Sequence, residues 1–188
     1  FIDYQHYYTF CGVLSQRNLF VNAAKEMLKI NDKERAVELL DMCQECVPEE
    51  NFPLDMTYLR TNNEYWVTDI ITLYFSLGER DKAKDIMSRF VQQLMESKVY
   101  YKNANKYIQY MIGFCQEEVA DLISRMEDDP AAADEALEMF HMYSGWMSLK
   151  DWPVESMWNI LLKQACELGV EEEAERIINP YADNLVLY

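Results

Sequence analysis

The chain has 188 residues, of which half are hydrophobic, and a formal net charge of −16 at pH 7. This hydrophobic fraction is too high for an intrinsically disordered chain, and five glycines with five prolines are too few for a fold rich in β-turns. Nucleic acids and anionic membrane surfaces attract clustered Lys and Arg, so 17 basic against 33 acidic residues argue against both as partners. The length predicts one domain or two small ones.

The chain shows no targeting or membrane-spanning segment. No apolar run reaches the roughly 18 residues that a membrane-spanning helix needs, so we expect no direct insertion of this segment into a membrane. The first residues also lack the basic and then apolar pattern of a signal peptide. Because the chain begins with Phe1 rather than Met, we expect it to be part of a longer protein.

Apolar residues at helical spacing predict an all-α fold with eight helices and no strand. The first five predicted helices cover, in chain order, about 13–30, Asp32 to Pro48, roughly 60–77, roughly 79–97 and about 103–127. The last three start at Pro130, at Pro153 and just after Gly169. Two of these starts are marked by an acidic residue shortly before a proline, Asp129 and Asp151, which is typical of a helix N-cap. The opening stretch, 1–16, is aromatic and poorly periodic, so we predict a linker there and a helical domain over 17–188.

One arrangement recurs along the chain: a residue that tolerates the left-handed conformation is followed five positions later by alanine. Gly78 leads Ala83 and Gly169 leads Ala174, while Asn31 leads Ala36 in a weaker form. Glycine or asparagine lets one helix stop and turn back, and alanine lets the second helix approach closely. The spacing predicts a further copy near 131, where Ala136 and Phe140 supply the second half. Four helical hairpins in series are typical of an α-α superhelix.

This pattern resembles the tetratricopeptide repeat (TPR) family, in a degenerate form with insertions between copies. The resemblance depends on the following residues, grouped by copy: Ala24, Ala36, Leu40 and Pro48; Tyr74, Gly78, Ala83 and Met87; Ser124, Ala136 and Phe140; Trp158, Leu161, Gly169, Ala174 and Ile178. It implies a TPR-like solenoid of about four hairpins.

The stretch 17–101 also resembles a more particular group, the soluble C-terminal region of large bacterial polytopic membrane proteins. Their membrane part is a C-type glycosyltransferase related to protein O-mannosyltransferases. The likeness lies in two hairpins joined by a connector with Pro48, Pro53 and Asp55, the second hairpin ending in the double tyrosine 100–101. It implies a membrane-tethered accessory domain with no catalytic group of its own. The periplasmic side is favoured by this resemblance, whereas the odd number of cysteines favours a reducing compartment.

Five cysteines do not form a disulfide framework, because the number is odd and the spacing irregular. Cys43 and Cys46 form a C-x-x-C, but they lie near the C-terminal end of a predicted helix, and a redox pair needs a helix N-terminus to lower the pKa of its thiol. A zinc site would need a second pair. We therefore predict that both cysteines are small apolar packing residues.

No catalytic, cofactor-binding or metal-ligating constellation is predicted. The two histidines, His6 and His141, are far apart in sequence, and no phosphate loop, nucleophile elbow or zinc-protease motif occurs. We expect His141 to be a packing or rim residue. The acidic runs 127–129 and 171–173 could hold a cation, but helix capping and a solvated face explain them more simply.

A solenoid binds its partners on the concave face, which the first helix of each hairpin lines. Aligning the copies places the following residues there: Asn18, Lys25, Lys29, Thr68, Thr72, Arg125, Asn159 and Lys163. Basic and amide groups meeting in one groove of so acidic a protein would receive a carboxylate or an acidic peptide. The alternative is that they are scattered surface residues, since an error of one position rotates each side chain by about 100°.

These observations predict a non-catalytic protein-interaction or scaffolding domain whose partner is a protein or peptide. A close alternative is a structural domain that packs on the membrane part of its own chain. Exposed apolar residues near the N-terminus would favour that alternative. An autonomous enzyme is the remaining possibility, and a deep pocket lined by His141 and several carboxylates would support it.

Overall fold

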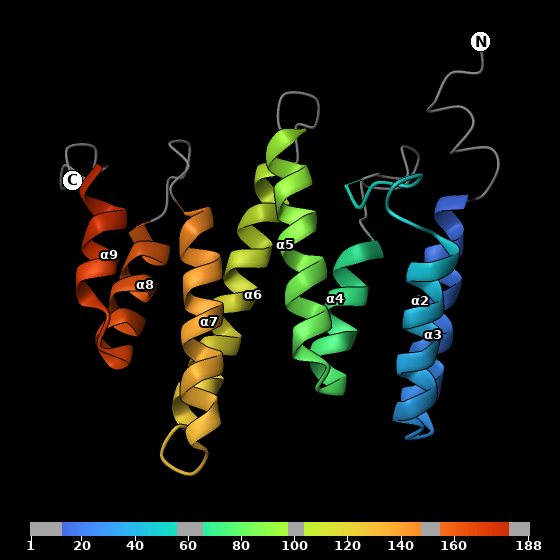
Figure 1. Cartoon of the computed structure of the whole chain (residues 1–188), viewed down its shortest axis with the longest axis horizontal. Coiled ribbons are helices and arrows are strands. Elements are labelled where there is room, and N and C mark those ends of the chain that lie inside the picture. The colour runs from blue at the N-terminus through green and yellow to red at the C-terminus, as the bar shows by residue number, and fades with distance from the viewer. Residues whose placement is uncertain (1–12, 56–65, 98–103, 148–154, 181–188) are drawn as a thin grey trace. The chain divides into compact units, whose positions relative to one another are not determined.

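The computed structural model describes residues 13–55, 66–97, 104–147 and 155–180, which form eight α-helices and no strand (Figure 1). The helices are α2 (Val13–Lys29), α3 (Lys33–Cys46), α4 (Trp66–Leu77), α5 (Arg80–Glu96), α6 (Ala104–Arg125), α7 (Pro130–Trp146), α8 (Glu155–Leu168) and α9 (Glu171–Ile178). The predicted all-α class is therefore confirmed. None of these helices combines the length and the apolar character that crossing a membrane requires.

Several predicted features lie outside the described residues. They are His6, the double tyrosine Tyr100 and Tyr101, the predicted helix start at Asp151 and Pro153, and most of the predicted linker 1–16. Of that linker, residues 13–16 are described, and they belong to the first turn of α2.

The chain divides into two compact units, residues 1–105 and 106–188. The first unit contains the hairpins α2–α3 and α4–α5. The second contains α6, apart from its first two residues, together with α7, α8 and α9.

Three hairpins turn on a residue in the left-handed conformation, as the sequence predicts. The backbone angle φ is +61° at Asn31, +85° at Gly78 and +70° at Gly169. The alanine five positions later is fully buried in each case: Ala36, Ala83 and Ala174. The recurring motif of the sequence is thus one repeated helix reversal.

The backbone hydrogen bonds of these three turns are the same. At Gly78, its N–H donates to the carbonyl of Phe75 (3.0 Å), and the next N–H, of Glu79, donates to the carbonyl of Tyr74 (2.9 Å). The turns at Asn31 and Gly169 repeat both bonds at the same offsets. This is the Schellman motif, which satisfies carbonyls that would otherwise be left unpaired at the helix end. The residue directly after each left-handed residue is the N-cap of the next helix: Asp32, Glu79 and Val170. The left-handed residue and this N-cap are therefore enough to reverse the chain.

The third hairpin, α6–α7, reverses differently. None of the described residues in this turn has positive φ, so the third copy lacks the left-handed residue of the other three, while its second helix starts at Pro130 after Asp129 as the sequence predicts. The reversal takes place over Met126–Asp129, where the N–H groups of Asp128 and Asp129 both donate to the carbonyl of Arg125. Asp129 then caps α7 by accepting a hydrogen bond from the N–H of Ala131 (3.1 Å), and Pro130 is the first helical residue. A strong helix start replaces the left-handed residue.

Within each unit, the second hairpin packs on both helices of the first. In the first unit, α4 contacts α2 and α3. In the second unit, α8 contacts α7 and is hydrogen-bonded to α6 through Gln164, whose Nε2 donates to the carbonyl of Gln116 (2.7 Å). The two units therefore use the same stacking scheme, and the continuous superhelix remains a prediction.

The core of each unit consists of the buried faces of these helices. Ala136 and Phe140, predicted to complete the third copy, are fully buried, whereas Ser124, predicted as its small residue, is exposed. The prediction for the C-x-x-C pair is correct for Cys43, which is fully buried, and wrong for Cys46, which is exposed. Three positions separate them on α3, and the apolar face at that end of the helix includes only the first.

Replacing Gly169 by alanine tests the repeated turn. We expect Gly169→Ala to lower the free energy of unfolding by about 1–2 kcal/mol, because an L-residue is strained at positive φ, although no atom lies within 4 Å of the added Cβ. Gly113→Ala in α6 is the matched control, since its Cβ also meets nothing within 4 Å. It should raise stability by about 0.5–1 kcal/mol. Chemical denaturation followed by circular dichroism measures both, and equal effects of the two variants would contradict the assignment.

Candidate functional site

The predicted groove residues of the first unit lie on α2 and α4, which contact each other. Lys25 on α2 forms an ion pair with Asp69 on α4, with 3.2 Å between Nζ and Oδ1. Thr68 precedes Asp69, and Thr72 lies one turn further on and donates its hydroxyl to the carbonyl of Thr68 (2.9 Å). The structure therefore brings Lys25 next to the α4 segment that carries both threonines.

The other two predicted residues of α2 make local contacts. Asn18 accepts a hydrogen bond from Asn22 (2.8 Å) one turn away. Lys29 pairs with Glu26 (2.6 Å), and both side chains are well exposed. Neither contact crosses to α4.

The remaining three predicted residues belong to the second unit. Arg125, at the end of α6, pairs with Asp121 (2.7 Å). Asn159 and Lys163 lie one turn apart on α8 and are both exposed, and Lys163 is 3.9 Å from Glu167. Whether these three join those of the first unit in one groove stays a prediction.

All four cations of the predicted groove have a carboxylate partner. The pairs are Lys25–Asp69, Lys29–Glu26, Arg125–Asp121 and Lys163–Glu167. Three of the pairs lie within one helix, and all are partly or well exposed, so each contributes little to stability. An acidic ligand would have to compete with these carboxylates, which the sequence analysis did not foresee.

A buried arginine holds the connector between the first two hairpins. Arg17 on α2 is almost fully buried and donates to the backbone carbonyls of Phe52 and of Pro53, the latter at 3.1 Å. Burial lowers the pKa of Arg17 from its ordinary value, yet arginine remains a cation at neutral pH. Nearby, burial raises the pKa of the Asp55 carboxyl, and it raises that of the Cys43 thiol to about 11. A high thiol pKa keeps Cys43 protonated and chemically inert.

The same connector is fixed from α5. The side-chain oxygen of Gln93 accepts hydrogen bonds from the N–H groups of Leu54 (2.6 Å) and Asp55 (3.4 Å), and its nitrogen donates to Glu49 (2.8 Å). Arg89 also pairs with Glu49. The connector is thus attached to the first helix of one hairpin and the second helix of the next.

Asp41 on α3 joins α4 and α5. It accepts a hydrogen bond from the Tyr74 hydroxyl (2.8 Å) and pairs with Lys82 (2.8 Å), whose ammonium lies 5.8 Å from the centre of the Tyr74 ring. The hydrogen bond to Asp41 raises the pKa of Lys82. Burial, followed by the bond to Asp41, raises the pKa of Tyr74. Both groups therefore stay protonated at neutral pH, as suits structural donors.

The second unit contains a buried polar network where α6, α7 and α8 meet. The hydroxyl of Tyr143 on α7 donates to Gln164 on α8, and Gln164 donates to the carbonyl of Gln116 on α6. The side chain of Gln116 in turn donates to the carbonyl of Met157 (3.5 Å). Burial raises the pKa of Tyr143. Each of these buried side chains has a partner, so the network fixes the register of the three helices without an unpaired group.

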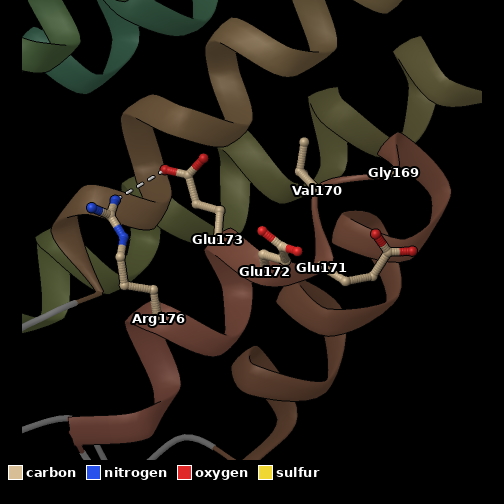
Figure 2. Close-up of a pocket in the computed structure, with 6 residues that line it drawn as sticks. All are labelled: Gly169, Val170, Glu171, Glu172, Glu173 and Arg176. Carbon is tan, nitrogen blue, oxygen red and sulfur yellow. Dashed lines mark hydrogen bonds and ion pairs between the residues drawn. The ribbon is translucent and has the colours of Figure 1, made fainter.

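His141 on α7 faces α9, where its Nδ1 lies 3.1 Å from a carboxylate oxygen of Glu173. Glu173 also pairs with Arg176 (3.3 Å) and, with it, borders an open hollow of about 630 Å³ (Figure 2). The other residues that line the hollow are Gly169, Val170, Glu171 and Glu172. These carboxylates occupy the first turn of α9, where the helix dipole favours negative charge. His141 does not line the hollow, and its side chain is exposed.

In the part of the chain that the structure describes, no three His, Cys, Asp or Glu side chains are placed to hold a metal ion. The chain also matches no protein-family model, no curated protein and no solved structure.

The residues that sequence analysis missed are those that join hairpins: Arg17, Asp41, Asp69, Gln93, Gln116 and Gln164. Some of them had a visible signal. Arg17 falls in register with the buried residues Val21 and Ala24 of α2, and Gln164 falls on the apolar face that contains Leu161. A polar residue on an apolar face needs a partner, but the partners of Arg17 and Gln164 are 21 to 48 positions away and do not follow from local spacing.

Replacing Arg17 tests the connector joint. Arg17→Met should lower the free energy of unfolding by about 2–4 kcal/mol, because it removes a buried cation and its hydrogen bonds to two part-buried carbonyls. Arg35→Met is the matched control, since Arg35 forms only an exposed ion pair with Glu38; it should change stability by no more than about 0.5 kcal/mol. Urea denaturation of the two variants checks this. An effect of Arg17→Met as small as that of the control would show that the hydrogen bonds from Arg17 to the connector do not stabilise the fold.

Proposed function

We propose that this chain is a non-catalytic helical-repeat domain that binds a protein or peptide, with a TPR-like arrangement of its hairpins. The observation that carries the proposal is that the same backbone turn and the same packing of one hairpin on the next recur along the chain. Three hairpins share the same backbone turn, and in each unit the second hairpin packs on both helices of the first. Repeated hairpins of this kind build extended surfaces on which partners bind. The proposal assigns the chain no catalytic group.

The binding surface we propose includes the α2–α4 contact. Lys25 and Asp69 lie there with 38–43% of each side chain exposed, next to Thr68 and Thr72. A carboxylate of an acidic peptide would compete with Asp69 for Lys25, and the threonine side chains add hydroxyl groups beside it. Asn159 and Lys163 offer a similar pair of groups on α8.

We further propose that the domain is the soluble tail of a bacterial membrane glycosyltransferase-like protein and faces the periplasm. Support comes from the resemblance over 17–101 and from the connector that is part of it. Pro53 and Asp55 belong to a segment that is held by Arg17 and Gln93. These contacts fix the proline-containing connector in the fold, so it is an ordered part of the domain and not a loose loop between the hairpins. A domain that packs on the membrane part of its own chain is a variant of the same proposal.

Charge reversal at the α2–α4 pair tests the binding surface. Lys25→Glu should weaken binding of an acidic partner by at least tenfold, because it removes a cation and places two carboxylates together. The swap Lys25→Glu with Asp69→Lys keeps an ion pair between the helices and moves the cation to α4. It should leave the stability of the fold close to that of the wild type while affinity stays low, because the cation no longer lies on α2. A partner is first captured by cross-linking at residue 25, and calorimetric titration then measures its affinity for each variant, while urea denaturation measures their stability. Unchanged affinity in both variants would show that the partner does not bind at the α2–α4 contact.

Topology reporters test the membrane tail. Alkaline phosphatase fused after residue 188 in the native gene should be active, and green fluorescent protein at the same place should be dark, because the first folds in the periplasm and the second in the cytoplasm. The gene itself should encode membrane spans ahead of this segment. The opposite reporter pattern would place the domain on the cytoplasmic side. A gene that encodes no membrane spans would show that the domain is not the tail of a membrane protein.

A further inference from the structure

Lys25 is the cation of the predicted groove whose carboxylate partner lies on another helix. Its Nζ is 3.2 Å from Oδ1 of Asp69 on α4, which is 44 positions away along the chain. Carboxylates of their own helices pair with the other three cations, Lys29, Arg125 and Lys163. A pair within one helix follows from the spacing of its charges, whereas the Lys25–Asp69 pair forms only when the two hairpins are stacked. The tertiary fold therefore places this carboxylate on Lys25.

The stacking of hairpins does not itself require a carboxylate at the position of Asp69. Gly78 and Gly169 are equivalent positions, since both have positive φ and the same two backbone hydrogen bonds. Asp69 lies nine positions before Gly78, and the residue nine positions before Gly169 is Ile160. The helix α8 thus packs on α7 with an apolar, 41% exposed residue where α4 has Asp69. The carboxylate belongs to this site and not to the repeated stacking.

The cation, in contrast, recurs in two of the hairpins. Lys25 and Lys163 stand at equivalent positions, six residues before the left-handed residue of their hairpins. Lys163 is 3.9 Å from Glu167 of its own helix, and its side chain is 76% exposed. The Lys25 side chain is 43% exposed and has the shorter distance of 3.2 Å to Asp69. Of two equivalent cations, the one on α2 is therefore paired more closely, and its partner comes from the neighbouring hairpin.

The Lys25–Asp69 pair opens at little cost. Both side chains are partly exposed, so water reaches each of them, and exposed ion pairs contribute little to stability. Asp69 also lies in the first turn of α4, where the helix dipole stabilises a carboxylate without help from the lysine. An incoming anion therefore displaces Asp69 from Lys25 without leaving a buried charge unpaired.

We propose that Asp69 is an internal competitor of the acidic ligand: its carboxylate pairs with Lys25 in the free protein and is displaced when a carboxylate of a bound peptide takes its place. This inference rests on the proposed function, which supplies the acidic ligand, and adds the regulation of that site. A lone carboxylate offers Lys25 no more than Asp69 already does. A ligand must therefore bring further contacts to displace it, and the competitor excludes acidic groups that bring none.

Removing the competitor tests the proposal, with fluorescein-labelled hexaglutamate as the probe. Asp69→Asn should strengthen the binding of this peptide to the intact chain by about three- to fivefold, the factor that corresponds to the strength of an exposed ion pair. Asp85→Asn is the matched control, because Asp85 pairs with Arg89 within α5 and the change in net charge is the same. It should leave the affinity unchanged. Fluorescence anisotropy measures the dissociation constant of each variant.

A double variant tests whether the gain acts through Lys25. Lys25→Gln should weaken binding of the peptide. Adding Asp69→Asn to it should then give no more gain than Asp85→Asn gives, because there is no ammonium left to release. A gain that persists without Lys25 would show that Asp69 acts only through its charge on the surface as a whole, and this would refute the competitor.

The other outcomes separate this inference from the proposed function. If Lys25→Gln weakens binding but Asp69→Asn acts like its control, the acidic-ligand surface stands and the competitor is refuted. If hexaglutamate binds neither the wild type nor Asp69→Asn, both are refuted. Binding that is detectable only with Asp69→Asn would support both, since the competitor then masks Lys25 completely. Circular dichroism and urea denaturation should show that each variant stays folded, as expected when an exposed pair is removed.

Discussion

The structure depends on how the chain reverses direction between two helices without leaving backbone groups unpaired. A residue with positive φ lets two successive N–H groups turn back onto the end of the first helix, and the next residue already caps the second helix. So short a connection forces the two helices side by side, which explains why Ala36, Ala83 and Ala174 are fully buried. The hairpin is thus specified locally, and the stacking of hairpins follows from the apolar faces that it leaves open.

Stacking is specified by a different kind of interaction. Apolar faces alone would allow a hairpin to slide by one helical turn on its neighbour, because Leu, Ile and Ala surfaces are interchangeable. Hydrogen bonds have fixed partners and remove this freedom. Arg17 holds the connector in the first unit, and Gln164 binds both helices of the preceding hairpin in the second. Each would leave buried polar groups unpaired in any other register, and that cost is larger than the net gain of the bond itself.

The division between local and long-range interactions decides what could be predicted from the sequence. The helices and the turns at Asn31, Gly78 and Gly169 were predicted because their signals lie within a few residues. The start of α7 at Asp129 and Pro130 was predicted from the same kind of local signal, although this turn has no left-handed residue. The pair Lys25–Asp69 and the role of Gln164 could not be predicted, since Asp69 is 44 positions from Lys25 and the two partners of Gln164 are 21 and 48 positions from it. All eight candidate groove residues lie on the helices on which they were predicted. Of the four carboxylate partners, only Asp69 is distant in sequence from its cation; the other three lie within the same helix.

The distribution of charge bears on where a partner can bind. Residues 106–188 contain 17 acidic and 5 basic residues, whereas 1–105 contain 16 and 12, so repulsion of acidic partners and of other copies is strongest around the second unit. Lys25, the cation of the proposed α2–α4 surface, lies in the more balanced unit. A strongly acidic surface suppresses unspecific contacts with acidic proteins, so an acidic peptide that binds beside Lys25 must be selected by specific contacts there. In the proposed binding mode, specificity arises as much from the repulsion of acidic partners elsewhere on the surface as from the contacts at Lys25.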